Sequence, residues 1–99
     1  MSEAKWNSVG EQQYRHVEGG DQIIGLLISR ETTVLGVQLY HIIPEGEEQT
    51  KAVLGTQGLD RLMEDVVDGQ EVMITLVQTV ATRSGSKFKE YSVFNRNHA

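Results

Sequence analysis

The 99-residue sequence contains no cysteine, one proline and no long apolar run. The absence of cysteine excludes disulfide bonds and thiolate metal sites. Apolar runs such as LLI are far shorter than the roughly 20 residues that a membrane-spanning helix needs. The polar N-terminus has none of the features of a signal or transit peptide. We therefore expect a cytoplasmic protein with no membrane partner.

Patterns typical of catalytic and metal sites are also missing. The three histidines, His16, His41 and His98, do not have the spacing of metal ligands. No serine lies in a nucleophile-elbow context. Neighbouring acids such as Glu64 and Asp65 do not face each other on a helix. The sequence predicts no enzyme and no metal or other cofactor.

Positive charge is scarce but concentrated. The formal net charge is -5, with nine Lys and Arg against 14 Asp and Glu. Residues 45–71 hold eight acids and two bases, a net of -6, whereas residues 82–99 hold four bases and one acid, a net of +3. Local charge decides which ligand is attracted, because salt screens charges beyond about 8 Å. The basic end of the chain is therefore the first place to look for an anionic ligand.

Hydrophobic periodicity predicts five strands, over residues 22–30, 33–43, 50–55, 70–83 and 88–95. In the first strand apolar residues are too dense for simple alternation, and Gly25 interrupts them. Glycine inside a strand is typical of a bulge or a sharp bend, which would let the strand bury both of its faces. In the last strand we place Tyr91 and Val93 inward, because that choice leaves Glu90 out of the core.

One short helix is expected within residues 56–69, between the third and fourth strands. Its apolar stripe follows the helical period and consists of Leu59, Leu62, Met63 and Val66. Thr56 is a suitable N-cap, and Gly69 is a suitable stop.

This order of elements is typical of an all-β protein with one helix, a five-stranded Greek-key OB-fold barrel, over residues 18–96. The helix would close one end of the barrel, and closure would remove exposed sheet edges. The competing fold is a five-stranded sheet with the helix packed on one face. Residues 1–17 show no period, and we interpret them as a loose arm anchored by Trp6 and Tyr14.

Between about residues 19 and 94 the chain resembles the small OB-fold single-stranded DNA-binding proteins of bacteriophages and prophages. The first strand starts with Gly-Asp and contains a central glycine, the second has an aromatic residue near its end, and Gly-Thr precedes a leucine-rich helix. An acidic-Gly turn then enters the fourth strand, and a basic Gly turn leads to a Lys-aromatic last strand. The residues concerned are Gly20, Asp21, Gly25, Tyr40, Gly55, Thr56, Leu59, Leu62, Asp68, Gly69, Gly85, Lys87, Phe88, Lys89, Tyr91 and Val93.

Single-stranded DNA is bound by cations that follow the phosphates and by aromatic faces that stack on the bases. In an OB-fold the ligand face is formed by strands two and three and by the loops that join strands one to two and four to five. The candidates at those places are Arg30, Tyr40, Lys51, Arg83, Lys87, Phe88 and Lys89. The same basic hairpin could instead serve only solubility and edge protection.

The predicted function is therefore non-sequence-specific binding of single-stranded DNA in phage replication or recombination. A homodimer would raise affinity by multiplying sites. Two alternatives stay open. The chain could be a protein-interaction or structural module that does not bind nucleic acid, or its acidic segment could mimic DNA.

Overall fold

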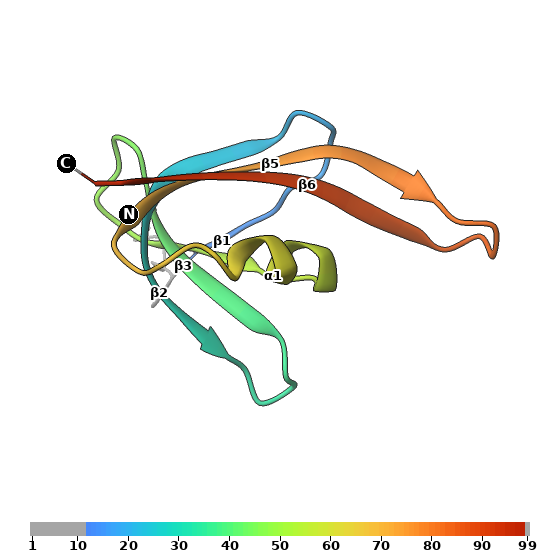
Figure 1. Cartoon of the computed structure of the whole chain (residues 1–99), viewed down its shortest axis with the longest axis horizontal. Helices are drawn as coiled ribbons and strands as arrows, with labels where there is room; N and C mark the ends of the chain where they lie inside the picture. Colours follow the sequence, from blue (N-terminus) through green and yellow to red (C-terminus); the bar gives the residue numbers. More distant parts are fainter. Residues whose placement is uncertain (1–11, 99) are drawn as a thin grey trace, which may run out of the picture.

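Six strands and one helix make up the computed structural model, which describes residues 12–98 (Figure 1). The elements are β1 (Gln12–Tyr14), β2 (Gln22–Thr32), β3 (Gln38–Pro44), β4 (Lys51–Leu54), α1 (Gln57–Met63), β5 (Gln70–Ala81) and β6 (Lys87–Asn97). The strands form one sheet in the order β1-β4-β3-β2-β5-β6. The prediction of an all-β protein with one helix is confirmed.

The sheet bends around β2, which curves strongly in Figure 1. β2 pairs antiparallel with both β3 and β5, and Gly25 takes part in both ladders. A Cβ at Gly25 would lie 2.1 Å from the backbone oxygen of Ile43, so only glycine permits this approach of β3. At Gly25 we expected a bulge or a sharp bend; the register shift of β2 against β3 lies after it, between Leu27 and Ser29.

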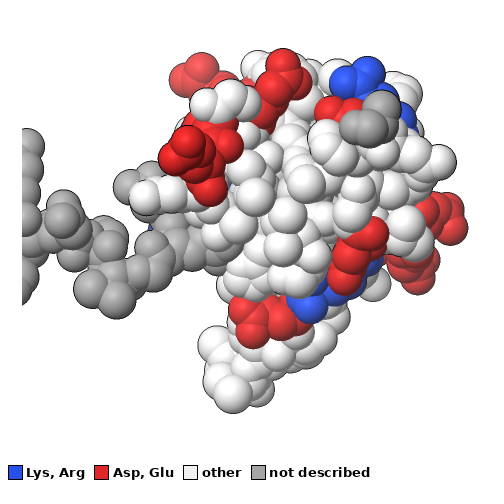
Figure 2. Space-filling model, turned by 90° about the vertical axis from the view of Figure 1, so that its left-hand side faces the viewer, with Lys and Arg blue, Asp and Glu red and all other residues white. Residues whose placement is uncertain are grey.

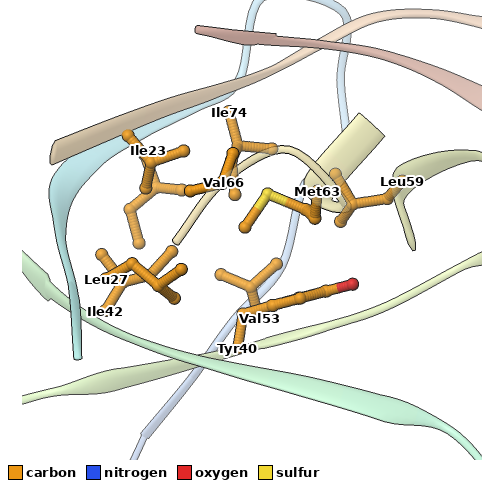
Figure 3. Packing of buried hydrophobic residues seen from close by; sticks show 10 residues of the cluster. Ile23, Leu27, Tyr40, Ile42, Val53, Leu59, Met63, Val66 and Ile74 are labelled. Atoms are coloured by element: carbon orange, nitrogen blue, oxygen red, sulfur yellow. The ribbon is translucent and has the colours of Figure 1, made fainter. Parts of the chain in front are cut away.

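The core lies on the concave side of the sheet, and α1 covers it (Figure 3). As predicted, Thr56 caps the helix, and its Oγ1 accepts a hydrogen bond of 3.2 Å from the Leu59 backbone N–H. The helix is shorter than expected and ends at Met63, while Leu62 is 43 % exposed. The buried cluster consists of Ile23, Leu27, Tyr40, Ile42, Val53, Leu59, Met63, Val66, Val72 and Ile74.

The long hairpin of β5 and β6 extends past α1 in Figure 1. Its strands pair antiparallel from Gln70 with Asn97 to Ala81 with Lys87. Tyr91 and Val93 pack against the core, which confirms their predicted inward orientation. The following residue, Phe94, points the other way and is 64 % exposed.

The sheet is not closed, which differs from the predicted five-stranded barrel. The extra strand β1 lies in the segment that we expected to be a loose arm, and it pairs in parallel with β4. β1 therefore occupies the edge of β4, and no ladder joins β1 to β6 within residues 12–98. The expected anchor Trp6 and the other residues up to 11 lie outside the described part of the chain.

Candidate nucleic-acid interface

A cleft of about 1000 Å³ lies beside the two unpaired sheet edges. One wall is formed by β1, the residues that follow it, the end of β4 and the first turn of α1. The start of β6 forms the other wall. The cleft is lined by Gln13, Tyr14, Arg15, His16, Val17, Val53, Leu54, Thr56, Gln57, Gly58, Arg61, Lys87, Phe88, Lys89 and Tyr91.

Side chains connect the two walls where no β-ladder does. His16 is 3 % exposed, and its ring contacts Tyr14 and Tyr91 edge-on, with centroid distances of 4.6 and 5.2 Å. Its Nε2 lies 3.0 Å from the backbone oxygen of Ile74 in β5. Lys89 Nζ on β6 donates a hydrogen bond of 2.5 Å to the backbone oxygen of His16. The segment after β1 is thus fastened to both strands of the long hairpin.

Burial lowers the pKa of His16 below its ordinary value, because a buried imidazolium loses hydration. His16 is therefore neutral at pH 7. Because the oxygen of Ile74 can only accept a hydrogen bond, Nε2 carries the ring proton.

The turn before β2 is fixed by the Asp21 carboxylate. Asp21 Oδ2 accepts hydrogen bonds of 2.8 Å from the backbone N–H groups of Val17 and Glu18. These two bonds lower the pKa of Asp21, because they favour its ionised form. The turn holds the residues that follow β1 in place beside the cleft.

The cleft is basic although the protein is acidic. Its lining contains Arg15, Arg61, Lys87 and Lys89, and none of the described residues in that lining is Asp or Glu. The side chains of Arg15, Arg61 and Lys87 form no hydrogen bond or ion pair with other residues of the described range, so their charges are available to a ligand.

Two smaller hollows have a different charge. A hollow of about 450 Å³ beside α1 is lined by two arginines, Arg30 and Arg61, and two acids, Asp60 and Glu64. Another, of about 290 Å³ near β4, has two glutamates against one lysine. Neither has the unbalanced positive charge that favours an anionic ligand.

Aromatic side chains accompany the cations of the cleft. Phe88 in β6 is 52 % exposed and lines the cleft, so part of its ring is open to a planar group. The Tyr14 hydroxyl donates to the backbone oxygen of Gln22 at 2.9 Å, which fixes the ring at the wall of the cleft. Burial raises the pKa of Tyr14, so the phenol stays protonated and uncharged at neutral pH.

Of the seven residues predicted as contacts, three meet in this cleft, namely Lys87, Phe88 and Lys89. Arg83 lies at the exposed tip of the β5–β6 hairpin and does not line the cleft. Lys51 on β4 lines a different hollow, and its Nζ is 3.5 Å from Glu47 Oε1, which offsets its charge.

Arg30 and Tyr40 are used inside the fold. The Arg30 guanidinium donates to the backbone oxygens of Met63, at 3.0 Å, and Val66. It also lies 3.5 Å from Asp68 Oδ1. Met63 ends α1, and its oxygen also accepts a hydrogen bond of 3.1 Å from the Val66 backbone N–H, so Arg30 holds the end of the helix and the turn that follows it.

Tyr40 is 2 % exposed, which leaves no ring face for stacking on a base. Its hydroxyl donates a 2.6 Å hydrogen bond to Asp60 Oδ1 in α1. Burial is the main cause of a strongly raised pKa of Tyr40, and the bond to the carboxylate adds to it. The ring therefore joins β3 to α1 as part of the core.

Sequence reasoning did not select Arg15, Arg61, Tyr14 and Tyr91 as site residues. The sequence did hold a signal for Tyr14 and Arg15, because these neighbours repeat the mixture of aromatic and basic residues found at residues 87–89. Arg61 gave no signal, since it lies among acids on the polar side of the helix.

Comparisons with protein-family models, with curated proteins and with solved structures found no match. Within residues 12–98 there is no helix long and apolar enough to cross a membrane. Over the same residues, no three His, Asp or Glu side chains are grouped so that they could hold a metal ion.

Proposed function

We propose that this protein binds single-stranded DNA without sequence preference, and that the basic cleft between β1 and β6 is the binding site. The observation that carries the proposal is the lining of the cleft, where four Lys and Arg side chains and no described acid surround exposed aromatic surface. The phosphates would lie along Arg15, Arg61 and Lys87, and a base would stack on Phe88.

The strand pairing supports a relationship to the OB-fold. The pairs β2–β3, β3–β4, β2–β5 and β5–β6, with α1 between β4 and β5, are those of a five-stranded Greek-key barrel without the ladder that closes it. A partly open barrel leaves room for an unpaired strand at the opening. This reading is in line with the resemblance to phage single-stranded DNA-binding proteins and with a role in replication or recombination.

The direct test is fluorescence polarisation of a labelled oligothymidine at low salt. With three cations at the phosphates, the logarithm of the affinity should fall with the logarithm of the salt concentration with a slope of about -2. No binding at micromolar protein would refute the proposal. An affinity that does not change with salt would refute the assignment to this cleft.

Charge variants locate the site. Lys87→Gln and Arg61→Gln should each weaken binding and reduce the salt slope by about 0.7, because each removes one phosphate contact. Lys51→Gln removes the same charge, but Glu47 already offsets Lys51, so affinity and slope should hardly change. Equal effects of Lys51→Gln and Lys87→Gln would show that only net charge matters.

An aromatic variant tests stacking separately from charge. Phe88→Leu keeps an apolar side chain but removes the ring face, and it should weaken binding by about fivefold or more, since stacking contributes about 1–3 kcal/mol per base. Phe94→Leu is the matched control on the same strand, because Phe94 does not line the cleft. If the two leucine variants bind equally well, Phe88 is not a stacking residue.

A further inference from the structure

The two walls of the basic cleft are not joined by their backbones. β1 pairs with β4 in parallel, and four antiparallel pairings lead from β4 to β6, so all three strands run in the same direction. β1 and β6 are the outermost strands of the sheet, and no ladder joins them within residues 12–98. The distance between the walls therefore depends on side-chain contacts.

The wall that carries Arg15 is held only weakly by its own strand. β1 has three residues, and its ladder with β4 ends where Tyr14 pairs with Val53. Arg15 lies beyond this last pair, so its position depends on the contacts of the next residue, His16. The His16 ring fixes the segment to β5, because its Nε2 donates a hydrogen bond of 3.0 Å to the backbone oxygen of Ile74. The opposite wall of the cleft, however, is formed by β6.

Lys89 connects this segment to β6. Its Nζ donates a hydrogen bond of 2.5 Å to the backbone oxygen of His16, which lies 73 positions earlier in the chain. Among the described residues, this is the one hydrogen bond that joins residues 12–21 to β6, and the edge-on contact of the His16 ring with Tyr91 supports it. A charged donor makes such a bond stronger than one between neutral groups. Lys89 therefore ties the two walls of the cleft together.

A second lysine of the cleft, Lys87, has no such contact. It precedes Lys89 by two residues, so the two side chains leave β6 on the same face, and both line the cleft. The Lys87 side chain forms no hydrogen bond or ion pair with the described residues. The charge of Lys89, in contrast, is used within the fold. The pKa of Asp21 is lowered mainly by the backbone N–H groups of Glu18 and Val17, and the charge of Lys89 contributes.

The placement of each cation matters because the protein carries a net charge of -5. Figure 2 shows a face on which acidic side chains outnumber basic ones, and such a surface repels a polyanion. The few cations of the cleft must therefore lie where the phosphates pass. Cations that are held in place before the ligand arrives lower the ordering cost of binding.

We propose that Lys89 is a positioning residue of the single-stranded DNA site, an inference that rests on the proposed function of the cleft. Lys89 holds the wall that carries Arg15 at a fixed distance from Lys87, so that both cations reach the same strand. Its ammonium group stays on the His16 oxygen and does not bind a phosphate.

The salt dependence of binding separates the two roles. Lys87→Met and Lys89→Met remove the same charge from the same face of one strand, and both should weaken binding of the labelled oligothymidine. Lys87→Met should reduce the salt slope by about 0.7, because one phosphate contact is lost. Lys89→Met should leave the slope near -2, because the binding-competent form keeps its three phosphate contacts. A wall that is in place about a tenth of the time lowers the affinity about tenfold.

Two controls accompany this measurement. Lys89→Arg should restore most of the affinity, because a guanidinium group also donates hydrogen bonds to a carbonyl oxygen. Circular dichroism checks that every variant is folded. A salt slope that falls in Lys89→Met as much as in Lys87→Met would overturn the proposal, because Lys89 would then be a phosphate contact.

Amide hydrogen exchange tests the positioning role without DNA. Lys89→Met should speed exchange at Val17, Glu18 and Gly20, whose amides are hydrogen-bonded in the wild type, and should leave β2 and β5 unchanged. Lys87→Met should change neither region. Unchanged exchange in Lys89→Met would overturn the positioning role, and equal acceleration in β2 and β5 would do the same, because it would show a general loss of stability. A wild-type chain that does not bind the oligothymidine would refute the proposed function, and the exchange rates would still decide the role of Lys89.

Discussion

Substitution of Arg30 tests whether this cation stabilises the fold or binds the ligand. Its guanidinium donates to the Met63 and Val66 backbone oxygens and lies 5.6 Å from the centre of the Tyr40 ring. Arg30→Gln removes both hydrogen bonds and the contact with the ring. It also leaves the backbone oxygens of Met63, at the end of α1, and Val66, in the turn that follows, with fewer donors.

The expected loss can be worked out from these contacts. A hydrogen bond from a charged donor contributes about 1.5–3 kcal/mol, and a cation–π contact about 0.5–1 kcal/mol. The Arg30 side chain is 29 % exposed and Asp68 is more so, which reduces the hydrogen-bond contribution and makes the ion pair nearly negligible. We expect Arg30→Gln to lower the free energy of unfolding by about 3 kcal/mol. Arg30→Lys should recover part of it, since an ammonium cannot hold two carbonyls as a planar guanidinium can.

Urea unfolding followed by circular dichroism measures this loss. The matched control is Arg61→Gln, because Arg61 is exposed on α1 and has no partner among the described residues. It should change stability by no more than about 0.5 kcal/mol but weaken binding of the oligothymidine. If Arg30→Gln costs less than about 1 kcal/mol and abolishes binding, Arg30 is a ligand contact and the reasoning from its hydrogen bonds fails.

Three further predictions concern stability. Burial lowers the pKa of His16, so the unfolded chain binds a proton at this residue more readily than the folded chain does. The stability that neutral His16 supports is therefore complete above about pH 6.5 and declines as the pH falls further. Thermal melts at several pH values should show this decline in the wild type but not in His16→Phe. Tyr40→Phe should cost about 1–2 kcal/mol in urea unfolding, because Asp60 loses the donor at 2.6 Å, and no loss would mean that water replaces the hydroxyl. Gly25→Ala should prevent stable folding, since its Cβ would lie 2.1 Å from a backbone oxygen of β3. Gly58→Ala is the control, because a Cβ there has open space in α1 and should raise the melting temperature slightly. Equal melting temperatures of the two alanine variants would contradict the packing at Gly25.

The elements themselves could be predicted because their signals are local. Keeping Glu90 out of the core predicted Tyr91 and Val93 inward, and the helical period predicted Leu59 and Met63 on the apolar side of the helix; all four pack in or against the core. The limits of the elements were less certain. The second strand was expected from residue 33, but β3 begins at Gln38 because residues 34–36 form a turn with Gly36 at φ +82°. Strand β1 had no detectable period, since its three residues are held by pairing with β4 rather than by a pattern of their own.

By itself the sequence determined the class of the protein, the inward face of its last strand and the concentration of positive charge near residues 83–89, because each depends on residues close together in the chain. Only the tertiary structure decided which cations are free. Arg30 and Arg61 carry the same charge, but Arg30 is held by carbonyls more than 30 positions away and Arg61 is not. Likewise, the cleft unites residues 13–17 with residues 87–91 although more than 60 residues separate them. Contacts between residues so far apart in the chain depend on which strands pair and where the sheet stays open. No local pattern of residues determines the strand pairing or the position of the opening.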